Sequence, residues 1–129
     1  MIRSVIANGS VRAALALFGC ALVLDGRCLT IKEVERLVVN TPEAVAIKRR
    51  GGCPTPEYQQ MGPSLALVHL RNACQRSGSG LIGNYVVDLR SGRVWSDIDQ
   101  TTEVDSQRLR TLRRRLRANL HDHGDCAAP

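Results

Sequence analysis

The residues best suited to chemistry in this 129-residue sequence are its cysteines, and there are five of them. They are Cys20, Cys28, Cys53, Cys74 and Cys126. Only 3% of the residues are aromatic, so the hydrophobic core must be built from smaller aliphatic side chains. A thin core gains stability from covalent cross-links, and small domains rich in cysteine are typical of oxidising compartments. The composition therefore favours disulfide chemistry.

The amino-terminal segment predicts export. Arg3 and Arg12 precede an apolar run over 13–24, which Asp25 closes. This layout is typical of a signal peptide, and the run is shorter than the roughly 20 residues that span a bilayer. We expect an export segment over 1–28, one domain over 29–120, no transmembrane span in the mature chain, and a periplasmic or secreted location. The alternatives are a buried helix, which the lack of a polar face disfavours, and a lipoprotein anchored through Cys20.

Once Cys20 is removed with the signal or lipidated, four cysteines remain and three pairings are open. We favour Cys53 with Cys74, which would close a loop of about 20 residues and stabilise the fold by about 3 kcal/mol. Cys28 would then pair with Cys126. The alternative role for Cys74, a nucleophile assisted by His69, is disfavoured because free thiols rarely persist outside the cytoplasm.

The C-terminal segment 121–126 carries metal-ligand types in one short stretch, including His121 and His123. His-x-His spacing can bind zinc or copper weakly, but structural sites take their ligands from more than one rigid element. We interpret 121–129 as a polar tail and expect no metal and no cofactor. No phosphate-binding loop or serine nucleophile elbow is present, so we expect no enzyme. A small hydrolase, with His69 or His121 beside a carboxylate, is the catalytic alternative.

Local signals predict two helices that follow each other closely. Thr30 and Glu33 form a capping box, so a helix should begin at Ile31 and end near Asn40. Thr41 and Pro42 then start a second helix, which the pair Gly51-Gly52 should end. The proline-rich stretch 53–56 is interpreted as a rigid loop.

Two regions predict strands. The apolar run 65–70 favours a buried strand, with a helix as the alternative. Tyr85, Val87 and Leu89 alternate with a second set of residues: Val86, Asp88 and Arg90. Gly92 supplies a turn before a return through Trp95, which is typical of a hairpin. The predicted fold class is α+β, with two N-terminal helices, an antiparallel sheet of about three strands and a C-terminal amphipathic helix.

That last helix carries much of the net charge of +6. Asp105 or Ser106 should cap it, and it should pack through one leucine stripe: Leu109, Leu112, Leu116 and Leu120. Six arginines occupy the rest of its surface, with no acid among them: Arg108, Arg110, Arg113, Arg114, Arg115 and Arg117. The candidate exposed residues for binding a partner are Arg110, Arg113, Arg114, Arg117, Tyr85 and Trp95.

Three interpretations of these arginines stay open. They could form an ordinary solvated face, bind an acidic protein or an anionic envelope component, or bind nucleic acid or another anionic polymer. Nucleic acid is disfavoured because no base-reading module is present and few aromatic residues are available for stacking.

The segment from Ile31 to Asp97 also resembles a known family. Its helix pair and strand, followed by the hairpin Asn84–Trp95, are similar to the small exported bacterial PepSY-type domains. The resemblance implies a helix packed on an antiparallel sheet and an inhibitory or protein-binding module without catalysis. The cysteines and the arginine-rich helix depart from that pattern. We therefore expect an exported, non-catalytic binding module, such as an inhibitor or immunity-type protein.

Overall fold

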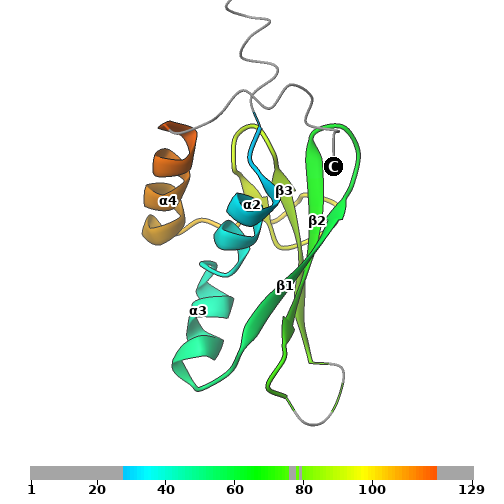
Figure 1. Ribbon diagram of the computed structural model, residues 1–129, viewed down its shortest axis with the longest axis vertical. Coiled ribbons are helices and arrows are strands. Elements are labelled where there is room, and N and C mark those ends of the chain that lie inside the picture. The colour runs from blue at the N-terminus through cyan, green and yellow to red at the C-terminus, as the bar shows by residue number, and fades with distance from the viewer. Residues whose placement is uncertain (1–27, 76–77, 79, 119–129) are drawn as a thin grey trace, which may run out of the picture.

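Three helices lie on one face of a four-stranded antiparallel sheet in the computed structural model (Figure 1). The structure describes residues 28–75, 78 and 80–118, so residues 1–27 of the predicted export segment and the predicted tail lie outside the described residues. The elements are, in chain order, α2 (Ile31–Val38), α3 (Pro42–Arg49), β1 (Pro54–Gln60), β2 (Leu65–Asn72), β3 (Leu81–Asp88), β4 (Val94–Trp95) and α4 (Gln107–Ala118). The predicted α+β class is confirmed.

The sheet is a simple meander in the order β1-β2-β3-β4, with each strand antiparallel to the next. The predicted hairpin is present between β3 and β4. Its turn is closed by Asp88, whose side chain accepts hydrogen bonds from the backbone amides of Arg90 and Ser91 at 2.8 and 2.9 Å. Gly92 has φ +76°, a conformation that L side chains rarely adopt.

The predicted loop over 53–56 is wrong, because Pro54 and Pro56 belong to β1 and pair with Asn72 and Leu70. The sheet therefore has four strands rather than about three. The strand tolerates two prolines because it is an edge strand. Cys53 and Met61, at its two ends, make the backbone hydrogen bonds to the β2 side. Residues 54 and 56 alternate with them, so each proline nitrogen, which has no hydrogen, is turned away from the sheet.

The predicted helix starts are confirmed. Thr30 accepts a hydrogen bond from the amide of Glu33 at 3.2 Å, and the Glu33 carboxylate accepts one from the amide of Thr30 at 2.9 Å. Pro42 is the first residue of α3, as expected. Ser106 caps α4, with its hydroxyl accepting from the amide of Leu109 at 3.2 Å.

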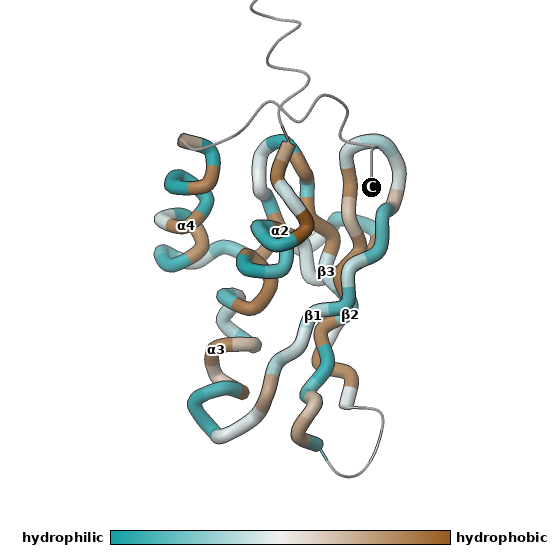
Figure 2. Tube along the Cα trace, viewed as in Figure 1, coloured by the Kyte–Doolittle hydropathy of each residue, from teal (hydrophilic) through white to brown (hydrophobic). Residues whose placement is uncertain are grey.

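The core lies between the helices and the sheet. Figure 2 shows hydrophobic stretches on β2 and β3, whereas the turns of α2 and α4 alternate between hydrophilic and hydrophobic. Leu109, Leu112 and Leu116 of the predicted stripe are buried there, and Leu120 lies outside the described residues. Within the described residues, no helix is long and apolar enough to cross a membrane.

The expectation that Tyr85 and Trp95 are exposed is wrong. Tyr85 is only 1% exposed, and its hydroxyl donates to the carboxylate of Glu43 at 2.7 Å. The pKa of Tyr85 is raised well above its ordinary value. Burial is the largest cause, and the hydrogen bond to Glu43 is the second. Trp95 is 9% exposed and pairs with Val86, while the guanidinium of Arg93 lies 5.1 Å from the centre of its ring. Both aromatic rings therefore stabilise the fold.

Candidate functional site

The buried leucines divide the arginines of α4 into two sets. At about 100° per residue, Arg108 and Arg115 lie on one side of the stripe, and Arg113 and Arg117 lie on the other. One hydrogen bond on each side shows which part of the molecule that side faces. Arg108 Nε donates to Asn40 Oδ1 at 2.9 Å, so its side faces the end of α2. Arg113 Nε donates to the Gly92 carbonyl oxygen at 3.1 Å, so its side faces the β3–β4 hairpin.

On the hairpin side, Arg117 has no ion pair with a described residue, but several other charges are paired within the molecule. Arg110 pairs with Asp105 at 2.8 Å, and Arg93 makes two hydrogen bonds to Glu103 at 2.9 and 2.8 Å. These bonds to Arg93 hold the pKa of Glu103 below its ordinary value.

Arg113 also has a structural role, and the expectation that it is exposed is wrong, because it is half-buried. A Cβ atom on Gly92 would lie 3.0 Å from its Cγ, so the arginine stem packs directly against the turn. Of the four arginines proposed from the sequence, Arg114 and Arg117 are the two that are exposed and have no ion pair within the described residues.

On the other side of the stripe, two neighbouring cavities lie beside α4, near the C-terminal ends of α2 and α3. The larger has a volume of about 650 Å³ and is lined by Val39, Asn40, Val45, Lys48, Arg49, Gly52, Cys53, Pro54, Thr55 and Arg108. The smaller has a volume of about 330 Å³ and is lined by Arg36, Asn40, Gln107, Arg108, Thr111, Leu112 and Arg115. Because Asn40 and Arg108 line both, we treat the two cavities as one cationic groove.

Five cationic side chains and no acidic one line this cationic groove: Arg36, Lys48, Arg49, Arg108 and Arg115. None of the five makes an ion pair with another described residue. Four of them stand in the last turn of a helix, where the negative end of the helix dipole favours a cation. Arg108 is different, because it stands in the first turn of α4, which carries no acid. Helix stability therefore does not account for Arg108.

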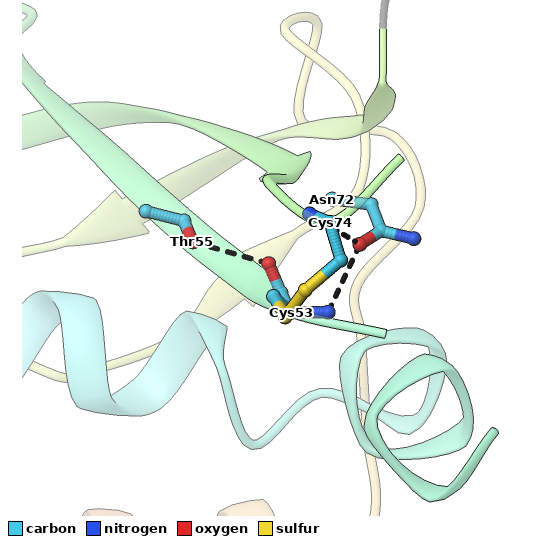
Figure 3. The surroundings of a disulfide bond; sticks show 4 residues. All are labelled: Cys53, Thr55, Asn72 and Cys74. Atoms are coloured by element: carbon cyan, nitrogen blue, oxygen red, sulfur yellow. Dashed lines mark hydrogen bonds between the residues drawn. A yellow bond between two sulfur atoms is a disulfide. The ribbon is translucent and has the colours of Figure 1, made fainter. Parts of the chain in front are cut away.

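The connection from α3 to β1 forms one wall of the cationic groove. Gly51 has φ +86°, and a Cβ atom on Gly52 would lie 2.9 Å from the carbonyl oxygen of Ile47, so both positions need glycine. The wall is then fixed by the predicted disulfide between Cys53 and Cys74, whose Cα atoms are 5.3 Å apart (Figure 3).

Asn72 reinforces this disulfide. Its Oδ1 accepts hydrogen bonds from the backbone amides of Cys53 and Cys74 at 2.9 and 3.3 Å, as Figure 3 shows. A nucleophilic role for Cys74 is ruled out in this state, because its sulfur is bonded. Cys28 is buried and also disulfide-bonded. Its predicted partner, Cys126, lies outside the described residues, so that pairing stays a prediction.

His69, the catalytic alternative, lies on the sheet face opposite the helices. Its Nδ1 is 2.5 Å from Asn84 Oδ1, and Glu57 stands opposite it in the register of β1 and β2. That carboxylate pairs with Arg71 at 3.2 Å. Neither His69 nor Glu57 lines the cationic groove, and His121 lies outside the described residues.

Sequence reasoning missed the residues that form the cationic groove. The sequence patterns assign no binding role to Lys48 or Arg49, and they group Arg108 and Arg115 with the other arginines of the last helix. The available signal was their seven-residue spacing, which places them on the same side of the leucine stripe. No protein-family model matches the chain, and neither a curated protein nor a solved structure matches it.

Proposed function

We propose that this protein is an exported, non-catalytic binding module that captures an acidic protein partner in the cationic groove. The observation that carries the proposal is the convergence of five cations, with no acid, on a concave site. The larger cavity, at about 650 Å³, is within the range of ordinary binding sites. A surface of one charge sign selects a partner of the other sign and accelerates its association.

The shape and lining of the cationic groove favour a protein over the other anionic partners. A flat membrane surface cannot enter a groove between helices. Proteins that hold single-stranded nucleic acid stack bases on aromatic side chains, and no aromatic residue lines either cavity. An acidic loop or terminus of a protein can enter, and an inhibitor or an immunity-type protein would bind its target in this way.

The disulfide supports the exported location. A structural bond between Cys53 and Cys74 persists in the periplasm or outside the cell, where thiols are oxidised. The signal-like layout before residue 28 points to the same compartments.

The test uses fluorescence anisotropy with a labelled twelve-residue peptide in which one leucine follows every two glutamates. Two double variants change the net charge equally: Arg49→Glu/Arg108→Glu in the cationic groove, and Arg114→Glu/Arg117→Glu on the opposite part of α4. We expect the first to weaken binding by about ten-fold or more, equivalent to about 1.4 kcal/mol, and the second to change it little. Equal losses in both variants, or tighter binding of a DNA oligonucleotide of equal charge, would overturn the proposal.

A further inference from the structure

Asn40 bridges two helices that are far apart in the sequence. Its Nδ2 donates to the backbone carbonyl of Arg36 at 2.7 Å, and its Oδ1 accepts from Arg108 Nε at 2.9 Å across 68 residues of chain. Both ends of the amide are therefore used, which fixes its orientation. Through it, the end of α2 sets the direction of the Arg108 side chain.

The bond to Asn40 leaves one edge of the Arg108 guanidinium available. Nε is used, whereas the two terminal nitrogens make no hydrogen bond or ion pair with the described residues. Two parallel N–H groups match the two oxygens of a carboxylate, and a guanidinium that is already oriented loses less entropy when it binds.

The location of Arg108 also favours an anion. It lies at the junction of the two cavities and in the first turn of α4, where the positive end of the helix dipole attracts negative charge. A carboxylate bound there would offset the arginine charge and would interact favourably with the positive end of the helix dipole.

The larger cavity adds an apolar wall beside these charges. Val39, Val45 and Pro54 line it together with Lys48 and Arg49. A ligand that is only charged would leave this wall in contact with water, whereas an aliphatic side chain next to a carboxylate would cover it.

We infer that Arg108 is the anchor of the cationic groove: it binds an aspartate or glutamate carboxylate of the partner end-on, in a segment whose neighbouring residue is aliphatic. Asn40 is the positioning residue that holds the guanidinium for this contact. The inference rests on the proposed function and adds to it the chemistry of the segment that binds.

The test uses substitutions in the protein and a change in the peptide that leave the net charge of each unchanged. A loss of affinity then reports the geometry of the contact or the apolar surface, not the charge. In the anisotropy assay with the glutamate–leucine peptide, Arg108→Lys should weaken binding by about ten-fold, because it keeps the cation and loses the paired N–H groups. The matched control, Arg115→Lys, should change affinity by less than about two-fold. Replacing every leucine of the peptide by serine should also weaken binding to the wild-type protein by several-fold.

A double-mutant cycle tests the positioning role of Asn40. Asn40→Ala should weaken binding when Arg108 is present and have little further effect when position 108 is already lysine, whereas a merely structural role would add equally in both backgrounds. Equal effects of Arg108→Lys and Arg115→Lys would overturn the anchor, and equal binding of both peptides would overturn the aliphatic neighbour. Either result could occur while Arg49→Glu/Arg108→Glu still weakens binding by about ten-fold or more, so the proposed function is tested separately.

Discussion

The two sides of α4 carry the same residue type and use it differently. On the hairpin side, Arg110 pairs with Asp105, and Arg113 supports the turn at Gly92. On the groove side, Arg108 and Arg115 line cavities and have no ion pair within the described residues. A run of arginines in a sequence is therefore not one functional unit, because the leucine stripe assigns its members to different surroundings.

The two sides of α4 also differ in how much they contribute to folding. On the hairpin side, Arg113 donates a hydrogen bond to the Gly92 carbonyl oxygen and packs its stem against the turn, and Arg110 pairs with Asp105. Five cations around one groove repel one another, and although the helix dipoles favour four of them, none of the five has an ion pair with a described residue. We therefore place binding on the groove side and structural support on the hairpin side.

The largest expected effect concerns the disulfide that fixes the groove wall. Cys53→Ala/Cys74→Ala should lower the free energy of unfolding by about 3 kcal/mol, because the unfolded chain is no longer constrained. Urea denaturation measures this loss. Hydrogen exchange should accelerate at the backbone amides of Gly52 and Thr55 more than at those around Gly92. Uniform acceleration along the chain would contradict a local role in the wall.

A smaller effect is expected when the hairpin support is removed. Arg113→Ala removes the hydrogen bond to the Gly92 carbonyl and the packed stem, so it should destabilise the fold by about 1–2 kcal/mol while the affinity for the acidic peptide stays unchanged. The control, Arg114→Ala, should stay within about 0.5 kcal/mol of the wild type. A loss of affinity without a loss of stability would assign Arg113 to binding.

The smallest effect is the acid response of the Arg93–Glu103 pair. Because the pKa of Glu103 is lowered in the folded state, the pair stabilises the fold above the carboxyl's ordinary pKa, and that stability is lost as pH falls through the lowered value. Glu103→Gln should make stability less dependent on pH in this range, by less than about 1 kcal/mol, since the pair is solvent-exposed. Thermal unfolding from pH 7 to pH 2 measures the difference, which should vanish in an Arg93→Gln background.

Most of the local structure could be predicted because its causes lie within a few residues. The capping box at Thr30, the proline at the start of α3 and the glycine turn of the hairpin each act locally. Strand β1 could not be predicted in the same way. Its prolines argue against a strand unless the strand is at an edge, and only the assembled sheet shows that.

The candidate site was harder to predict, because it depends on how distant elements are arranged. The contact between Asn40 and Arg108 joins α2 to α4, and periodicity does not say which side of α4 faces α2. The alternation of side chains along the strand likewise predicts that Tyr85 lies on one face of the sheet. It does not predict that the helices cover that face. The disulfide was predictable because few pairings were available and its loop is short.

The most direct test is nuclear magnetic resonance mapping of the acidic peptide on the isotope-labelled protein. Titration should shift the backbone amide signals of Asn40, Lys48, Thr55 and Arg108, all of which line the cationic groove. It should leave those of 90–95, in the hairpin, unchanged. Shifts confined to the hairpin and to the exposed arginines Arg114 and Arg117 would contradict the division between the two sides of α4.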